Sequence, residues 1–240
     1  MERPEKAKTL FITATDTGAG KTFFTLALAR ALSSLGLSVA VYKPIQTGCK
    51  PNNSLSSLGS EDLELILEHC SKDFPELGVK CSYCLSLPAT PELAAKEDRV
   101  EINLQKLQND FEDLCAKYDV VLVEGAGGLI VPIAQNFVMA DLISSFGCDA
   151  LLVVQNKLGC INQACLSAHY AKSKGINLKG FVLNNISNSE KENPKVLANN
   201  AVFIQEYAKI SCLAELPFSL EESLEADNAK NLEQIILGFK

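Results

Sequence analysis

The chain has 240 residues, enough for one large core or two small ones, because single cores stop growing at roughly 250–300 residues. Its 47% hydrophobic and 21% charged content is that of a compact globular protein rather than a disordered or fibrous one. With 22 Lys and Arg against 29 Asp and Glu, the net charge of −7 disfavours general binding to nucleic acid or to an anionic membrane surface.

The cysteine content and the N-terminal segment together indicate the cellular compartment in which the protein resides. The nine cysteines are odd in number and diluted in a long chain, which favours reduced thiols over a disulfide framework. Residues 1–6 carry both signs of charge, and the apolar run that follows ends by Ala14, too short for a signal sequence or a membrane span. We therefore expect a cytoplasmic protein. No repeat or linker-like segment divides the sequence, so we expect a single domain over residues 1–240.

Short apolar runs alternate along the chain with stretches of helical period. The runs predict strands at Leu10–Thr13, Val39–Tyr42, Val120–Val123, Leu151–Val154, Phe181–Leu183 and Cys212–Leu216. Helices are predicted over Thr22–Leu35, Asn103–Lys117, Ile161–Lys174 and Lys191–Lys209. Apolar runs without polar alternation are typical of strands buried on both faces. The sequence therefore predicts a three-layer α/β fold, with a mostly parallel sheet between helices.

The segment from Leu10 to Thr22 combines a strand, a turn containing glycine and the beginning of a helix. Unpaired N–H groups and the helix dipole attract anions at a helix N-terminus, so the backbone of Gly18 to Thr22 is predicted to bind phosphates. Lys21 would contact the β- and γ-phosphates, and the Thr22 hydroxyl would be a ligand of Mg²⁺. Thr15 stands where the general phosphate-loop pattern has its first glycine. A glycine-rich turn followed by Lys-Thr by chance is the alternative.

Two further candidates follow predicted strands. Lys43 lies at the carboxyl end of its strand, where open α/β sheets bind ligands, so we expect it over the site and not in the core. A solvated lysine before a proline turn is the alternative. Glu124 ends another strand and precedes Gly125-Ala126-Gly127-Gly128, in the place where phosphate-loop proteins hold a metal-side carboxylate. For Glu124, the alternative is a helix N-cap.

Other polar residues carry weaker signals. Asp62 lies in the first turn of a predicted helix, where an acid is ordinary, and Asn184 and Asn185 follow a strand, where asparagine is common in turns. An amide there can also pair with an adenine edge.

The pair Cys81 and Cys84 lacks a second ligand pair at the spacing of a zinc site, and the adjacent His69 and Cys70 do not supply one. We therefore interpret these cysteines as core and loop thiols. The two histidines lie outside every motif, so a Cys–His nucleophile has no support.

Taken together, these segments resemble the dethiobiotin synthetase family. The resemblance rests on Thr15-Asp16-Thr17 with Gly20-Lys21-Thr22, on Tyr42-Lys43-Pro44, on Glu124-Gly125-Ala126-Gly127-Gly128 and on Lys157-Leu158-Gly159-Cys160-Ile161-Asn162. Their order and spacing run over nearly the whole chain. The resemblance implies an ATP- and Mg²⁺-dependent ligase of biotin biosynthesis. Such an enzyme closes the ureido ring of dethiobiotin from 7,8-diaminononanoate and CO₂, through a carbamate and a mixed anhydride with phosphate.

The resemblance also implies roles for individual residues. Thr22, Asp62 and Glu124 would hold the metal, and Lys21 and Lys43 would act in catalysis. The nucleotide would contact Gly18, Ala19, Gly20, Lys21, Thr22, Phe23, Asp62, Glu124, Gly125, Ala126, Gly127, Asn184, Asn185, Pro217, Phe218 and Ser219. The substrate would contact Thr47 and, from the second subunit of a homodimer, Gly159, Cys160, Ile161 and Asn162.

The sequence departs from the family pattern at three positions. Ala14 replaces a glycine, Thr47 stands where serine is common but keeps the hydroxyl, and Glu92 stands where the family often has histidine. Of the three changes, Glu92 is the one that we expect to affect the substrate pocket or its pH response.

The nearest alternative among phosphate-loop proteins is a regulatory ATPase of the ParA and MinD type. Those proteins carry a signature lysine five residues before the phosphate-loop lysine, and this chain has Asp16 there. Their membrane-bound forms also need a basic amphipathic C-terminal helix. The segment from Asn231 to Leu237 is short and not basic, and we expect it to dock on the sheet.

Overall fold

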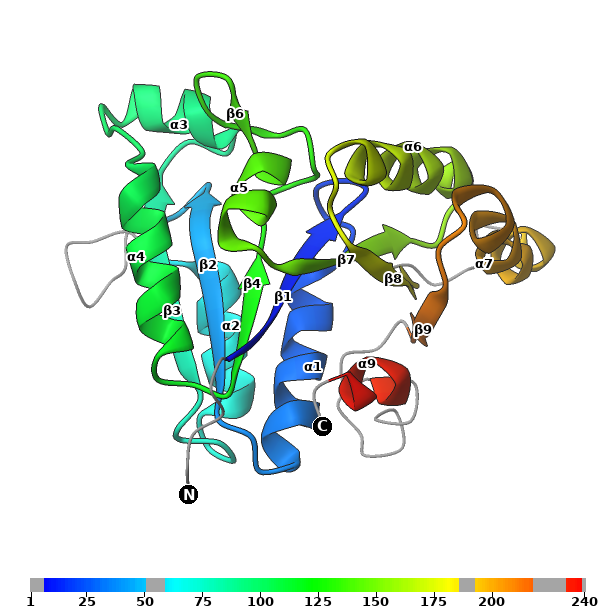
Figure 1. Cartoon of the computed structure of the whole chain (residues 1–240), viewed down its shortest axis with the longest axis horizontal. Helices are drawn as coiled ribbons and strands as arrows, with labels where there is room; N and C mark the ends of the chain where they lie inside the picture. The colour runs from blue at the N-terminus through cyan, green and yellow to red at the C-terminus, as the bar shows by residue number, and fades with distance from the viewer. Residues whose placement is uncertain (1–6, 51–58, 186–192, 218–231, 239–240) are drawn as a thin grey trace.

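A seven-stranded sheet forms the centre of the computed structural model, which describes residues 7–50, 59–185, 193–217 and 232–238 (Figure 1). Its order is β3-β2-β4-β1-β7-β8-β9, and every neighbouring pair is parallel. The strands are β1 (Lys8–Ala14), β2 (Val39–Thr47), β3 (Gly78–Leu85), β4 (Val120–Glu124), β7 (Asp149–Gln155), β8 (Leu178–Asn184) and β9 (Cys212–Leu216). A separate antiparallel pair joins β5 (Pro132–Ala134) and β6 (Phe137–Val138). The predicted parallel α/β architecture is confirmed.

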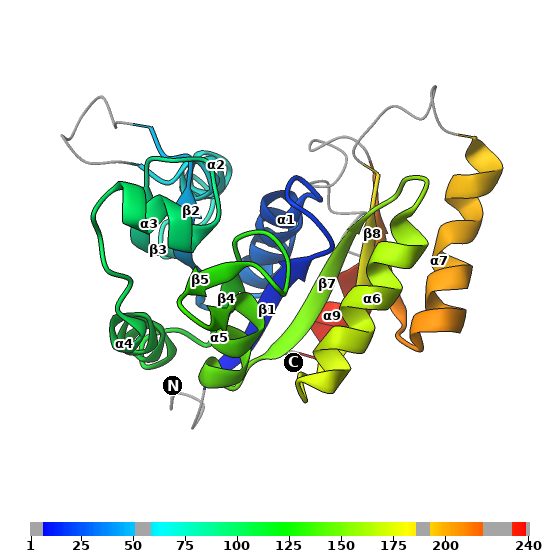
Figure 2. The same ribbon diagram turned by 90° about the horizontal axis from the view of Figure 1, so that it is seen from above.

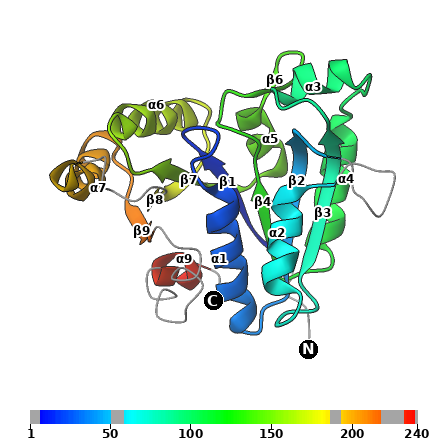
Figure 3. The ribbon, with the colours of Figure 1, turned by 180° about the vertical axis from the view of Figure 1, so that it is seen from behind.

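Helices cover both faces of this sheet and complete the three predicted layers. On one face lie α1 (Lys21–Ser34), α2 (Glu61–Cys70) and α9 (Glu233–Leu237); Figure 3 shows α1 and α2 in front of the strands and α9 beside α1. The opposite face carries α4 (Leu104–Cys115), α5 (Met139–Phe146), α6 (Cys160–Ser173) and α7 (Pro194–Ala208), as Figure 2 shows from above. The short α3 (Pro91–Glu97) follows β3.

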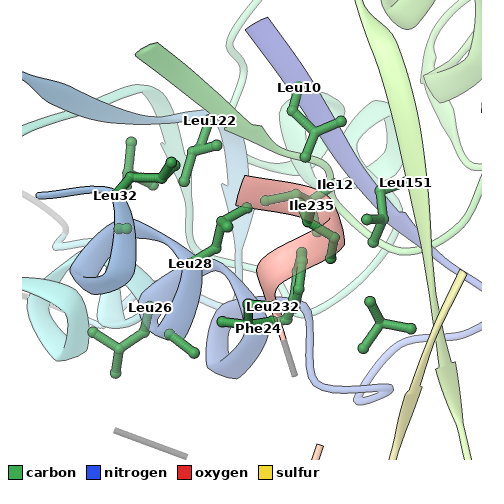
Figure 4. Packing of buried hydrophobic residues seen from close by; sticks show 14 of the residues in the cluster. Leu10, Ile12, Phe24, Leu26, Leu28, Leu32, Leu122, Leu151, Leu232 and Ile235 are labelled. Carbon is green, nitrogen blue, oxygen red and sulfur yellow. The ribbon is translucent and has the colours of Figure 1, made fainter. Parts of the chain in front are cut away.

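The central strands are apolar because helices cover them on both sides. In β4 all five residues are buried. On the α1 face, Phe24 and Leu28 pack with Leu122 and Leu151 of the sheet (Figure 4). Ile235 of α9 joins the same cluster. The expectation that the C-terminal segment docks on the core is therefore confirmed for its described residues.

Several elements were not predicted from the sequence. Strand β3 is an edge strand whose first seven residues are only half-buried, so it lacks the continuous apolar run that marks the central strands. The short α3, α5 and the β5–β6 pair were also missed. None of the nine cysteines, all of which lie in the described ranges, forms a disulfide. None of the helices in the described ranges combines the length and apolarity needed to span a membrane.

Candidate active site

Four elements bring one cluster of polar side chains together at the carboxyl edge of the sheet. Strands β2 and β4 pair Tyr42 with Val123, so the next residues along them, Lys43 and Glu124, are neighbours. The Lys43 ammonium Nζ lies 2.6 Å from Glu124 Oε1 and 2.5 Å from Asp62 Oδ2, which comes from the first turn of α2. From the first turn of α1, the Thr22 hydroxyl donates a hydrogen bond to the same Glu124 oxygen at 2.9 Å.

The cluster is charged even though it is buried. Glu124 is 1% exposed and Lys43 is 4% exposed, contrary to the expectation that this lysine lies outside the core. Burial lowers the pKa of Lys43, but the carboxylates of Glu124 and Asp62 outweigh burial and hold the pKa above its usual value. Burial likewise raises the pKa of Asp62, and the Lys43 ammonium more than reverses this effect. Lys43 is thus a buried cation held between two carboxylates.

The phosphate loop lies between β1 and α1, next to this cluster. Gly18 and Gly20 adopt φ angles of 76° and 93°, the left-handed region that favours glycine. Gly20 is the N-cap of α1, and as a glycine it has no side chain that could accept a hydrogen bond from the first turn. The first hydrogen bond of the helix runs from Phe24 N–H to the Gly20 carbonyl. The N–H groups before Phe24 therefore have no helical partner. Lys21 is buried as well, and burial first and the charge of Lys43 second lower its pKa to about 8.

A cavity of about 510 Å³ opens over these groups, a size suited to a small-molecule ligand. The predicted site residues among its lining are Gly18, Gly20, Lys21, Thr22, Lys43, Thr47, Asp62, Glu124, Ala126 and Gly127. The remaining lining residues are Thr17, Gln46, Val131 and the run Pro88-Ala89-Thr90-Pro91, which leads from β3 into the first residue of α3. The structure therefore places the proposed phosphate, metal and catalytic residues around one space.

Other residues that were predicted to contact the nucleotide do not line the cavity but pack against the phosphate loop or lie near it. Ala19 is buried, and the Asn184 side-chain amide donates to its carbonyl at 3.0 Å. The Asn185 amide donates to the Leu216 carbonyl and accepts from Asn156, so its hydrogen bonds link strand ends within the chain. Phe23 packs against the α1-side core, and a Cβ at Gly125 would come within 2.8 Å of the Phe11 ring.

The remaining predicted positions lie away from the cavity lining. Pro217 is half-buried just after β9, whereas Phe218 and Ser219 fall outside the described residues. Gly159, Cys160, Ile161 and Asn162 form the start of α6. Gly159 caps this helix with φ 90° and no side-chain hydrogen bond. One chain alone does not bring this helix start to the cavity.

Comparison with known proteins decides the family. A family model described as an AAA domain matches residues 8–225. The ATP-dependent dethiobiotin synthetase of Methanocaldococcus jannaschii is 37% identical over 74% of this chain and 80% of its own length. The enzyme of the same name from Caldicellulosiruptor bescii is 31% identical over 90% of both chains. The chain belongs to the dethiobiotin synthetase family. Its members are ATP-dependent ligases, as the sequence motifs implied.

Solved structures share the fold of this dethiobiotin synthetase family member. The cell division ATPase MinD of Pyrococcus furiosus has a TM-score of 0.61 at 18% identity, covering 98% of this chain and 100% of its own. A ParA family ATPase from Chlorobium tepidum has a TM-score of 0.57 at 16% identity, covering 95% and 92%. At such identities the likeness shows the shared fold.

Two residues that the sequence reasoning did not assign position the carboxylate of Asp62. The Ser60 hydroxyl donates a short hydrogen bond to Gln46 Oε1 and accepts one from Leu63 N–H at 3.4 Å, so Ser60 caps α2. Because α2 begins one residue later, this contact ties the helix start to β2 beside Lys43. The signal in the sequence was a serine directly before Glu-Asp, which is typical of a helix N-cap.

The departures from the family pattern lie outside the charged cluster. Glu92 pairs with Lys96 at 2.6 Å and lines a separate hollow of about 530 Å³ with Ile102 and Ile133. Ala14 is buried at the end of β1, and its carbonyl is 3.0 Å from where a Cβ on Gly128 would lie.

The oxygen atoms of the charged cluster fit a divalent cation. Glu124 Oε2 is buried and has no hydrogen-bond partner in the described structure. The Thr22 hydroxyl and the Asp62 carboxylate supply further hard oxygen donors beside it. Mg²⁺ prefers such oxygens and keeps several waters, so these residues suit it chemically. A bound cation would take over from Lys43 in neutralising the two carboxylates.

Proposed function

We propose that this protein is an ATP- and Mg²⁺-dependent dethiobiotin synthetase that closes the ureido ring from 7,8-diaminononanoate and CO₂. The main support is the buried cluster of Thr22, Lys43, Asp62 and Glu124, which borders a ligand-sized cavity and a phosphate loop. Membership in a family of ATP-dependent dethiobiotin synthetases supplies the reaction.

In this proposal the chain binds ATP through its backbone and two side chains. The N–H groups from Gly18 to Phe23 surround the phosphates, and Lys21 contacts the β- and γ-phosphates. Asn184 holds Ala19 in place with its Nδ2 and offers Oδ1 to the amino group of adenine. Thr22, Asp62 and Glu124 would hold Mg²⁺, which when bound would supply positive charge to the phosphates.

The reaction proceeds in three steps. One amine of the diamine captures CO₂ as a carbamate, held by a hydrogen bond from the Thr47 hydroxyl. A carbamate oxygen then attacks the γ-phosphorus of ATP and ADP leaves, giving a carbamic-phosphoric anhydride. The second amine attacks the anhydride carbon, the ring closes and phosphate leaves. Negative charge accumulates on the carbamate and phosphoryl oxygens, and Lys21 and Lys43 supply oriented cations there.

The proposed active unit is a homodimer. Leu166 and Ile130 are 64% and 62% exposed, and Leu158, just before the start of α6, is 74% exposed. Ile130 and Leu166 line a shallow hollow beside the phosphate loop. A second copy packed there would cover these side chains. The partner's Gly159–Asn162 helix start would then receive the substrate carboxylate, an anion at a helix N-terminus.

An isotope assay tests the reaction. The protein is given 7,8-diaminononanoate, labelled bicarbonate, ATP and Mg²⁺, and acid-stable label is sought in dethiobiotin. We expect label fixation that requires the diamine. ATP hydrolysis that is unchanged without the diamine, together with no fixed label, would overturn the assignment in favour of a regulatory ATPase.

Conservative pairs of variants test the residue roles in the same assay. Thr22→Val and Thr47→Val should lose most of the activity, whereas Thr22→Ser and Thr47→Ser keep the hydroxyl and should retain it. Lys80→Met is the matched control, because Lys80 pairs with Asp110 away from the cavity. Equal activity of the valine and serine variants would contradict the assigned roles.

The dimer is tested by mass measurement at decreasing concentration. We expect a dimer for the wild type and a monomer of low activity for Leu166→Asp. A wild-type protein that is monomeric at nanomolar concentration and fully active would overturn the shared site.

A further inference from the structure

Two thiols on the edge strand β3 lie next to the lysine of the charged cluster. Strands β2 and β3 pair Lys43 with Cys81 and Gln46 with Cys84. Paired residues of neighbouring strands lie about 4.8 Å apart and turn to the same face of the sheet. Cys81 packs against the core on the α1 side, the side on which Lys43 contacts Asp62 of α2. The thiol of Cys81 is therefore a neighbour of the Lys43 side chain.

The two thiols share one face because β3 departs from regular alternation between them. Residues three apart in a regular strand point to opposite faces. Here, however, two consecutive residues both turn toward α4. The Ser82 hydroxyl donates to the Asp110 carboxylate, and the Tyr83 hydroxyl accepts from the backbone N–H at the N-cap of that helix. Cys84 therefore lies on the same face as Cys81, and their Sγ atoms are 3.5 Å apart.

Hydrogen bonds hold both sulfur atoms in this arrangement. The Cys84 thiol donates to Cys81 Sγ, and the Cys81 thiol donates to the Tyr83 carbonyl at 3.3 Å. The Cys49 thiol, just beyond the end of β2, donates instead to the Gln46 carbonyl at 3.5 Å, and Cys49 is 4% exposed. Cys81 and Cys84 are half-buried on a strand that has a neighbour on one side only. These two sulfur atoms are therefore adjacent, oriented and within reach of a small solute.

The spacing of the two sulfur atoms fits one bridging atom. A disulfide needs an S–S distance of about 2.05 Å, well below the separation in this structure. An atom bonded to both sulfurs at about 2.3 Å, the length of a zinc–thiolate bond, would form an angle of about 100° with sulfurs 3.5 Å apart. Among the described residues, no group of three His, Cys, Asp or Glu side chains is placed to hold a metal ion. The bridging atom must therefore need only two bonds to the protein, unlike a structural zinc ion.

We propose that Cys81 and Cys84 together bind one trivalent arsenic atom that carries a single organic group, as supplied by an organic arsenoxide. Trivalent arsenic is a soft acceptor that suits soft thiolate ligands, and it forms three bonds in a pyramid. One bond goes to the carbon of the organic group, and two go to the protein. In the reaction the arsenic–oxygen bond and two S–H bonds break, two As–S bonds form, and the oxygen leaves as water with both thiol protons. Arsenic stays trivalent, so the step needs no oxidant or reductant.

Arsenic bound to these thiols would also act on the charged cluster. Lys43 and Gln46 line the cavity, and the two cysteines are their partners on β3. The organic group adds volume beside Lys43, which is 4% exposed and closely packed. We therefore expect the bound group to displace Lys43 from Asp62 and to stop the ligase reaction. This consequence rests on the proposed function, whereas the binding of arsenic does not.

Thiol mapping with phenylarsine oxide tests the binding directly. The full-length protein is reduced, desalted, treated with one equivalent of the reagent, alkylated and digested with trypsin. Cys81 and Cys84 lie together in the peptide 81–96, which has no other cysteine. We expect both to be protected from alkylation, and the intact mass to rise by one phenylarsenic group less two hydrogen atoms. Added 2,3-dimercaptopropanol, a dithiol, should release the group, whereas the same concentration of thiol from a monothiol should not.

Matched variants identify the two ligands. Cys81→Ser and Cys84→Ser should each lose the adduct, whereas Cys165→Ser should keep it, because Cys165 is also half-buried but lies on α6. Protection of Cys49, which falls in the peptide 31–72, or an adduct that persists in Cys81→Ser would overturn the proposal. The map of the wild-type protein decides the matter even where a variant fails to fold.

Comparison with the unfolded chain distinguishes a site built by the fold from two cysteines that are merely close in sequence. We expect the native protein to bind phenylarsine oxide about tenfold more tightly than the same chain in urea, because the fold already holds the sulfur atoms together. Equal affinities would overturn the proposal.

The effect on the cavity is measured separately by label fixation. A loss of fixation on arsenic binding that the dithiol reverses would support this effect, and an unchanged rate with arsenic bound would refute this effect alone. If the untreated protein fixes no label, the proposed function fails, while the thiol map still decides whether the arsenic site exists.

Discussion

Replacing Lys43 by methionine gives the sharpest test of the buried cluster. Methionine preserves much of the side-chain length but removes the charge between Glu124 and Asp62. The side chain of Glu124 is 1% exposed, and its Oε2 has no hydrogen-bond partner in the described structure. The variant therefore leaves a buried carboxylate without its counterion. We expect a large loss of stability as well as of activity.

The expected loss of stability in Lys43→Met follows from the distance between the two charges and from their burial. At 2.6 Å and an effective dielectric constant of about 20, the attraction between Lys43 and Glu124 is roughly 6 kcal/mol before the cost of desolvating both groups. Removing one partner of a buried pair costs about 3–5 kcal/mol in measured cases, and we expect a loss in that range. For a chain of this size, about 1 kcal/mol shifts Tm by roughly 2–4 °C, so Lys43→Met should melt about 6–20 °C lower.

The assay is urea unfolding followed by circular dichroism, with EDTA present and no nucleotide. The double variant Lys43→Met/Glu124→Gln leaves a neutral amide and should regain most of the stability lost in Lys43→Met. Lys80→Met is the control, because Lys80 is 34% exposed and its pair should contribute at most about 1 kcal/mol. A Lys43→Met protein as stable as Lys80→Met, or a double variant less stable than the single one, would refute the reasoning.

Three further substitutions test local features by urea unfolding. Ser60→Ala removes the cap of α2 and should cost about 0.5–2 kcal/mol, whereas Ser60→Asn should keep most of it; equal losses would contradict the capping role. Leu28→Ala removes a fully buried side chain and should cost about 2–5 kcal/mol, against less than about 1.5 for Leu28→Met. Burial raises the pKa of Asp110, but hydrogen bonds from Lys106 and Lys80 outweigh it and lower the pKa to about 2. Because the folded pKa lies below the unfolded one, the stabilisation of about 1 kcal/mol lost in Asp110→Asn should be present at pH 7 and shrink toward pH 3; a constant difference would contradict it.

The position of the site could be predicted because the sheet is parallel. In such a sheet every strand ends at the same edge, so polar residues that follow apolar runs converge. Lys43 and Glu124 each follow such a run, and the pairing of Tyr42 with Val123 makes them neighbours. The phosphate loop was recognisable for the same reason, since Lys21 follows a strand and begins a helix.

Contacts between distant segments could not be predicted in this way. The burial of Lys43 depends on α2, whose start is joined to β2 by the contact between Ser60 and Gln46. No local pattern in the sequence specifies that contact. Strand β3 was missed because an edge strand has one neighbour and needs no continuous apolar run. The interpretation of Cys81 and Cys84 as core and loop thiols was therefore wrong about the loop, because both lie on β3.

Local charge explains how an acidic protein can bind a polyphosphate. The net charge of −7 disfavours anions in general. Within the site, however, the charges of Lys21 and Lys43 balance those of Asp62 and Glu124, so these four side chains together are close to neutral. Adding the proposed Mg²⁺ to the two carboxylates would make the same site positive by about two charges. We therefore expect the nucleotide to bind tightly only together with the metal, because the carboxylates that would hold the metal otherwise cancel the lysines.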